Sequence, residues 1–123
     1  MIPWHGGKKM KLDAIHGAFG EAEYLVRQAQ ERAMTGDHTA AINYLMKAID
    51  KNPGYPEAYT LLGNCQDCLD KKEDAIASYD KALQIDPTHA DAWFNKGMSL
   101  KKLGKTKEAT QCIEKSIDLY CGR

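Results

Sequence analysis

The stretch PEAYTLLGNCQDCLDKKEDAIASYDKALQIDPTH, residues 56–89, is the middle of three related units, because its pattern recurs on both sides at one spacing. Pro53 and Pro87 lie 34 residues apart. Other residues fall in register at the same period: Ala41, Ala75 and Ala109; Leu45, Tyr79 and Ile113; Ala48, Ala82 and Ser116. Such a period is the sequence signature of a repeat protein, in which neighbouring units bury a continuous core. We therefore divide the chain into an N-terminal extension and three repeats: 1–21, 22–55, 56–89 and 90–123.

The three units carry one set of signature residues to different degrees. The middle unit has Tyr59, Leu62, Gly63, Ala75, Tyr79, Ala82 and Pro87, and it departs from the set at Gln66. The third unit keeps Trp93, Gly97 and Ala109, and the first keeps Ala41, Ala48 and Pro53. At this period, the set resembles the tetratricopeptide repeat. The resemblance implies an all-α fold: an α-solenoid, or right-handed superhelix, of three antiparallel helix pairs with a short N-terminal extension.

Proline, glycine and capping residues predict where six helices begin and end. Pro56 suits the first position of a helix, where its missing N–H costs little, and Asp37 can cap the helix that follows it. Thr88 and Asp70 each precede an acid by three residues, as in a capping box, and Gly104 separates the last two helices. The predicted helices lie near 21–35, 38–51, 56–69, 72–85, 89–103 and 106–120.

Small residues on the predicted helices indicate where the two helices of a pair approach closely. Gly63 and Gly97 occupy one such position on the first helix of a pair, and Ala75 and Ala109 face them from the second. Large side chains such as Tyr79 fill the space between, since packed helices interdigitate large residues with small ones.

The resemblance also implies that the first helix of each pair lines a concave groove, the surface that such stacked repeats use for binding. The predicted groove residues are Glu23, Val26, Arg27, Gln30, Met34, Glu57, Thr60, Leu61, Asn64, Asp67, Asp91, Phe94, Asn95, Met98 and Lys101. An acidic row is expected at Glu23, Glu57 and Asp91, although acids are favoured in the first turn of any helix. An apolar strip is expected at Val26, Met34, Leu61, Phe94 and Met98, with irregular core packing as the alternative.

These residues predict a non-enzymatic adaptor or scaffold that binds a peptide or helix of another protein carrying basic residues. Family members that bind a C-terminal carboxylate use cationic and amide side chains at set groove positions. Here those positions hold Val26, Gln30, Leu61, Asp91 and Asn95, so we do not expect a carboxylate-terminated ligand. The amides of Asn64 and Asn95 offer both donors and acceptors to a partner's main chain.

Two other functions remain as alternatives. Repeat arrays need a polar terminal cap, and the last predicted helix keeps four apolar or aromatic residues that could pair with another copy: Ile113, Ile117, Leu119 and Tyr120. An N-terminal stripe of Leu12, Ile15 and Phe19 could instead cover such a surface. Cys65 and Cys68 could form a redox or metal site, but they lie late in a helix, where the dipole opposes a thiolate. We interpret both as packing residues.

Composition narrows the class of protein further. The 123 residues include 17 Lys and Arg against 17 Asp and Glu, so the basic footprint of a nucleic-acid-binding protein is missing. No apolar run approaches about 18 residues, and Gly6, Gly7 and Lys8 interrupt the start, where a signal peptide would be apolar. We therefore expect a cytoplasmic protein that acts on neither membranes nor nucleic acids. No Ser, Cys or Asp stands at a catalytic spacing from a histidine, so we expect no enzymatic activity, cofactor or metal.

Overall fold

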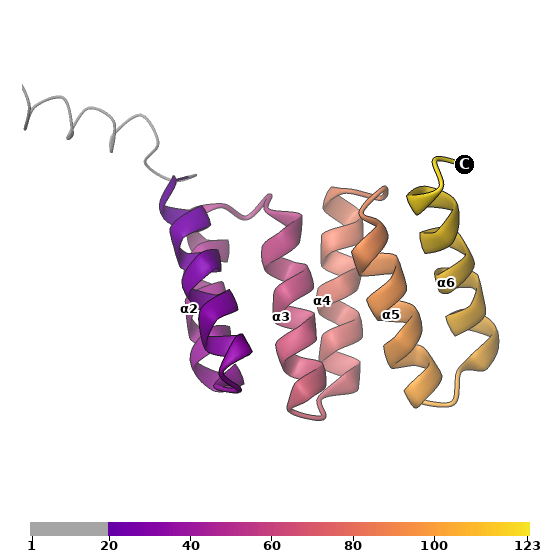
Figure 1. The fold of residues 1–123 in the computed structure, drawn as a ribbon, viewed down its shortest axis with the longest axis horizontal. Helices are drawn as coiled ribbons and strands as arrows, with labels where there is room; N and C mark the ends of the chain where they lie inside the picture. The colour runs from indigo at the N-terminus through magenta and orange to yellow at the C-terminus, as the bar shows by residue number, and fades with distance from the viewer. Residues whose placement is uncertain (1–19) are drawn as a thin grey trace, which may run out of the picture.

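The computed structural model describes residues 20–123, which form six helices and no strand (Figure 1). The chain is helical over 20–34 and then forms α2 (His38–Lys51), α3 (Pro56–Cys68), α4 (Lys72–Ile85), α5 (Ala90–Lys102) and α6 (Thr106–Tyr120). The helix pairs follow one another along the stack, with helix 20–34 overlapping α2 in this view, and from α2 onward each helix packs against the next along the chain. The predicted all-α helical repeat is confirmed. The predicted stripe of Leu12, Ile15 and Phe19 lies outside the described residues.

Local sequence signals account for several helix ends. Pro56 is the first residue of α3, and the Asp37 carboxylate accepts a hydrogen bond from the Ala40 N–H at 3.1 Å, so it caps α2 as predicted. Gly104 ends α5 with φ +82°, a left-handed conformation that suits a residue without a Cβ. These positions turn the chain within a few residues, which keeps successive helices adjacent.

The two predicted capping boxes are wrong. The Thr88 hydroxyl donates to Asp86 at 2.6 Å, and His89 precedes α5 instead, without a side-chain cap. Asp70 adopts φ 62° in the turn between α3 and α4, and its carboxylate binds Lys72. Asp70 thus holds the left-handed position that Gly104 fills one repeat later, and its backbone conformation prevents it from capping the next helix.

Close contact between paired helices depends on the predicted glycines. A Cβ placed on Gly63 would lie 2.4 Å from Cε1 of Tyr79, and one on Gly97 would lie 2.7 Å from Cγ1 of Ile113. Ala75 is completely buried and Ala109 is 2% exposed on the facing helices. The prediction that small residues set the spacing within a pair is confirmed for the second and third pairs.

The apolar core runs along the stack in three clusters. The first joins helix 20–34 to α2 and α3 through Ala22, Val26, Ala29, Ala41, Leu45, Ala48, Ala58, Leu62 and Cys65. The second joins α3, α4 and α5 through Tyr59, Ala82, Leu83 and Ala92. The third joins α5 and α6 through Leu100, Ala109 and Cys112. Because each cluster spans neighbouring helices, the repeats stabilise one another and hold the first helices of successive pairs in a fixed relation.

Candidate binding groove

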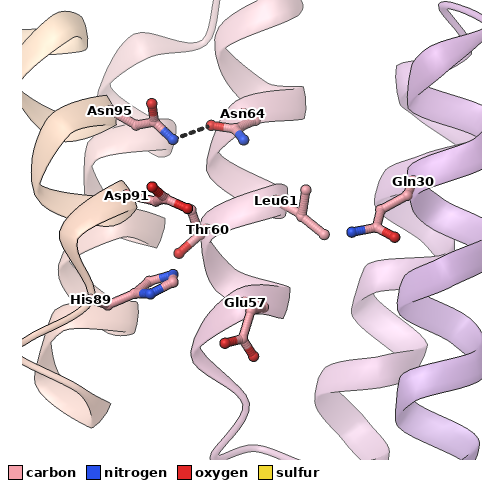
Figure 2. A pocket seen from close by; sticks show the side chains of 8 residues that line it. All are labelled: Gln30, Glu57, Thr60, Leu61, Asn64, His89, Asp91 and Asn95. Carbon is pink, nitrogen blue, oxygen red and sulfur yellow. Dashed lines mark hydrogen bonds between the residues drawn. The ribbon is translucent and has the colours of Figure 1, made fainter. Parts of the chain in front are cut away.

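A pocket of about 180 Å³ lies between the first helices of the three pairs (Figure 2). Helix 20–34 and α5 flank α3, which supplies half of the lining. The lining residues are Gln30, Glu57, Thr60, Leu61, Asn64, His89, Asp91 and Asn95. All except His89 are among the predicted groove residues, so the structure brings together side chains from all three repeats.

Helical spacing explains why α3 can line the pocket and hold the core at once. Glu57, Leu61 and Asn64 recur at intervals of four and three residues, so they share one face of the helix. Leu62 and Cys65 recur on the neighbouring face and are buried in the first core cluster. Packing of that second face fixes the direction in which the pocket side chains point.

The pocket lining carries two acidic residues and no Lys or Arg. Glu57 and Asp91 are exposed carboxylates at equivalent positions in consecutive repeats. Asp91 also accepts a hydrogen bond from the Tyr120 hydroxyl of α6, and this bond raises the pKa of Tyr120 above its ordinary value. Glu23, the third member of the predicted acidic row, is exposed on helix 20–34 outside the pocket lining.

A network of polar side chains lies beside the pocket and joins α3, α4 and α5. Nδ2 of Asn95 is 3.0 Å from Oδ1 of Asn64, as Figure 2 shows. The Tyr79 hydroxyl is 2.8 Å from both Asn64 and Asp67, and the Ser99 hydroxyl donates to Asp67 at 2.6 Å. Burial, followed by the hydrogen bond to Asp67, raises the pKa of Tyr79 well above its ordinary value. The predicted groove residue Asp67 therefore belongs to a network that holds the two pocket asparagines in place.

The predicted apolar strip is interrupted. Val26 is 4% exposed and contributes to the first core cluster, where helix 20–34 meets α2 and α3, so its side chain is unavailable to a partner. Leu61 lines the pocket, whereas Phe94 and Met34 are exposed outside its lining, at 40% and 86%. Met98 is half-buried on α5. The apolar surface of the pocket itself therefore comes from Leu61.

The other predicted groove residues divide between core and solvent. Thr60 is 5% exposed, and its hydroxyl donates to the Pro56 carbonyl at 3.1 Å, so it forms part of the pocket wall. Arg27 and Lys101 are exposed and lie outside the lining. The structure thus places the acidic and amide side chains in the pocket and leaves these two cations beyond it.

Sequence reasoning missed His89 as a lining residue. It is the N-cap of α5 and lies two residues before Asp91, so it enters the pocket beside the first turn of that helix. Its Nε2 atom is buried without a hydrogen-bond partner among residues 20–123. The available signal was its place at the start of a predicted groove helix, 89–103.

Cys65 and Cys68 differ in burial. Cys65 is buried in the core, and burial raises its pKa to about 11, which disfavours the reactive thiolate. Cys68 is exposed, so the interpretation of both thiols as packing residues is correct only for Cys65. Within the described part of the chain, no three His, Cys, Asp or Glu residues are grouped so that they could hold a metal ion.

Two of the four residues predicted for self-association are exposed on α6. Ile117 and Tyr120 are 45% and 60% exposed, whereas Ile113 and Leu119 are half-buried. Ile113 packs closely over Gly97, so it belongs to the contact between α5 and α6. None of the helices in residues 20–123 has the length and apolar character needed to cross a membrane.

Models of the tetratricopeptide repeat match three segments of the sequence, residues 22–55, 56–89 and 78–111. The first two matches cover the first two helix pairs, and the third runs from α4 through α5 into α6. The chain belongs to the tetratricopeptide repeat family. Membership agrees with the repeated helix pairs and with the close glycine contacts inside them.

Two relatives with this repeat are much longer proteins. The chain is 31% identical over 113 residues to tetratricopeptide repeat-containing protein trd-1 of Caenorhabditis elegans, covering 84% of this chain and 14% of that protein. It is 26% identical over 83 residues to anaphase-promoting complex subunit 3 of Schizosaccharomyces pombe, covering 68% of this chain and 12% of that protein. The chain therefore spans only about an eighth of the length of these relatives.

Solved structures with similar folds include MamA and a repeat domain of Spaghetti (RPAP3). MamA superposes with a TM-score of 0.77 at 28% identity, covering 81% of this chain and 58% of that one. The first tetratricopeptide domain of Spaghetti, bound to the HSP90 peptide SRMEEVD, has a TM-score of 0.81 at 21% identity, covering 85% and 82%. Because its identity is only 21%, the likeness to the Spaghetti domain concerns the fold alone.

Proposed function

We propose that this chain is a protein-interaction module, an adaptor or scaffold, which binds a peptide or helix of a partner protein in the groove between its three first helices. The observation that carries the proposal is the pocket itself, where three repeats contribute two exposed carboxylates, three amides and one leucine. Stacked repeats use their concave surface for binding, and a fold neighbour is known with a bound peptide. The partner segment would occupy this pocket.

The charge of the pocket favours a basic side chain of the partner. Glu57 and Asp91 lie on adjacent helices of one pocket that has no Lys or Arg in its lining. A Lys or Arg seated there makes charge-assisted hydrogen bonds, which are roughly twice as strong as neutral ones. Gln30, Asn64 and Asn95 supply polar groups for the partner's main chain, and Leu61 supplies an apolar contact. An acidic segment or a free carboxylate would be repelled by the same pair of charges.

Two short peptides test this proposal. A lysine- and leucine-containing peptide and its counterpart with Glu in place of each Lys would be titrated into the labelled protein, followed by nuclear magnetic resonance. We expect only the lysine peptide to shift resonances of α3 and α5, and Glu57→Gln with Asp91→Asn to weaken its binding by about tenfold or more. Asn at position 91 keeps an acceptor for Tyr120.

A matched variant controls for net charge. Glu73→Gln with Asp74→Asn removes two exposed carboxylates from the first turn of α4, which lies outside the pocket. This variant should bind the lysine peptide nearly as well as the unchanged protein does. Equal binding of both peptides, binding of neither, or equal losses in the two double variants would contradict the proposal.

Self-association is the second candidate function, and one comparison within the chain favours it. Leu83 is 9% exposed because it packs in the cluster that joins α4 to α5, whereas Ile117, at the equivalent position of α6, is 45% exposed. Head-to-tail stacking is opposed by Tyr24, which stands where Ala58 and Ala92 are fully buried against the preceding pair. We therefore propose that two copies pair α6 with α6 about a two-fold axis.

Sedimentation at several concentrations tests this pairing. A dimer should form at high micromolar concentration, and Ile117→Glu should abolish it by placing a charge in the contact. Tyr24→Ala opens the opposite end of the stack and should leave the dimer unchanged. A protein that stays monomeric, or a dimer that survives Ile117→Glu, would refute the pairing without affecting the groove.

A further inference from the structure

The Tyr79 hydroxyl has one hydrogen but lies within hydrogen-bonding distance of two side chains, Asp67 and Asn64. The Tyr79 hydroxyl oxygen lies 2.8 Å from Oδ2 of Asp67 and 2.8 Å from the side-chain oxygen position of Asn64. A tyrosine hydroxyl carries a single hydrogen and can donate only one such bond. At the other contact the hydrogen must come from the neighbour. A carboxylate has no hydrogen to give, whereas a side-chain amide has two on its nitrogen.

The surroundings of Asp67 favour donation from Tyr79 to the carboxylate. Oδ1 of Asp67 is buried without a hydrogen-bond partner among residues 20–123, so Oδ2 is the atom that receives the donors. Those donors are Tyr79 and Ser99. If Tyr79 turned its hydrogen to Asn64, two oxygens would face each other at 2.8 Å and Ser99 would be the remaining donor. Bonds to a charged acceptor are stronger than bonds to an amide oxygen, so the hydrogen belongs on the Asp67 side.

The asparagine amides can satisfy this arrangement by turning. The two orientations of an amide have the same shape and exchange the nitrogen with the oxygen. When Nδ2 of Asn64 faces Tyr79, its two hydrogens reach the Tyr79 oxygen and the Asn95 side chain. Asn95 then turns its own oxygen toward Asn64, at the 3.0 Å separation of the two side chains. Every close contact of the network now joins one donor to one acceptor.

We propose that Tyr79 donates to Asp67 and thereby turns the amides of Asn64 and Asn95, so that an oxygen of Asn64 faces the groove. In Figure 2 the second amide atom of Asn64 points away from Asn95, toward the side of the pocket where Leu61 lies. An oxygen at that place joins the Glu57 and Asp91 carboxylates as a third acceptor. Tyr79 and Asp67 are positioning residues, which set the hydrogen-bonding pattern of the pocket from behind it.

The acceptors of the pocket indicate which chemical group of a partner binds there. This step rests on the proposed function. A Lys ammonium has three donors and no acceptor, and an Arg guanidinium has five donors and no acceptor. Either cation matches a pocket whose carboxylates and Asn64 oxygen all accept. A neutral amide side chain would place one of its own acceptors against them. The network therefore selects a cationic side chain by hydrogen-bond polarity as well as by charge.

Nuclear magnetic resonance of the free protein tests the orientation directly. In protein labelled with nitrogen-15, we expect strong nuclear Overhauser effects between the Asn64 side-chain amide hydrogens and the Tyr79 ring hydrogens ortho to the hydroxyl. Both Asn64 amide hydrogens should also exchange slowly with solvent. Effects from these hydrogens to the Leu61 methyl groups instead, with fast exchange, would overturn the inference, whether or not any peptide binds.

A variant of Asp67 provides the second test. Asp67→Leu keeps a side chain of similar size but has no acceptor for Tyr79, so the tyrosine hydrogen turns to Asn64 and the Asn64 nitrogen turns toward the groove. We expect the Asn64–Tyr79 effects to weaken and the lysine peptide to bind about tenfold less tightly. Asp74→Asn, an exposed change of the same charge on α4, should alter neither. Unchanged Asn64 signals in folded Asp67→Leu protein would overturn the inference. Failure of the lysine peptide to bind the unchanged protein would count against the proposed function alone.

Discussion

A methyl group at Gly63 should separate α3 from α4. The added Cβ would lie 2.4 Å from Cε1 of Tyr79 and 2.8 Å from Cδ1 and Cζ, where carbon atoms ordinarily stay about 3.5–4.0 Å apart. Tyr79 is fully buried and its hydroxyl is held by the polar network, so the ring has no free direction in which to move. Overpacking of this kind costs about 1–3 kcal/mol, and the overlap here is severe enough for the upper end of that range.

Part of the cost is offset because alanine is a better helix former than glycine by about 1 kcal/mol. We therefore expect Gly63→Ala to lower the free energy of unfolding by about 2 kcal/mol and the melting temperature by about 8 °C. Urea and thermal unfolding followed by circular dichroism measure both quantities. Gly54→Ala is the control, because its Cβ would meet nothing nearer than Oδ1 of Asn52 at 3.7 Å.

A second substitution distinguishes the clash from a general loss of flexibility. Replacing Tyr79 with Leu removes the ring atoms that Gly63→Ala would strike, so the double variant should be more stable than the sum of the two single effects implies. If Gly63→Ala is as stable as the unchanged protein, the contact between α3 and α4 does not depend on a bare glycine, and the reasoning fails.

Three further predictions concern the core and its turns. Asp70→Gly should raise the urea midpoint and Gly104→Asp should lower it, because both positions have a left-handed backbone that glycine adopts at less cost. A lower midpoint for Asp70→Gly or a higher one for Gly104→Asp would contradict this. Ala75→Leu should cost about 1–3 kcal/mol in urea unfolding, and more than Ala109→Leu, because the middle repeat has two neighbours. Cys65→Ala should leave lysine-peptide binding intact, since this thiol packs in the core; a titration that shows lost binding would revive the thiol hypothesis.

Helix positions and the close contacts within pairs could be predicted from the sequence. The predicted ranges 38–51, 72–85 and 106–120 coincide with α2, α4 and α6. Proline, capping aspartate and turn glycine act on backbone groups a few residues away, so their effects are local. The close approach at Gly63 followed from the repeat pattern, which places glycine opposite the large Tyr79.

The same local signals misled where the backbone had a competing requirement. Asp70 resembles a capping residue by spacing, yet it stands at the left-handed turn position that Gly104 fills one repeat later. Repeat alignment contained that information, because the two positions are one period apart.

The linear sequence alone determined the repeat period, the all-α class and the helix face that carries Glu57, Leu61 and Asn64, because periodicity along a helix is a property of spacing. It could not say that Val26 is buried while Leu61 lines the pocket, since exposure depends on which neighbouring helices cover a face. Only the packed chain brings Tyr79 to Asp67 and Asp67 to Ser99, across 12 and 32 residues of sequence. Hydrogen bonds over such distances form when the stacking of repeats places three helices together, and they give the pocket asparagines their orientation.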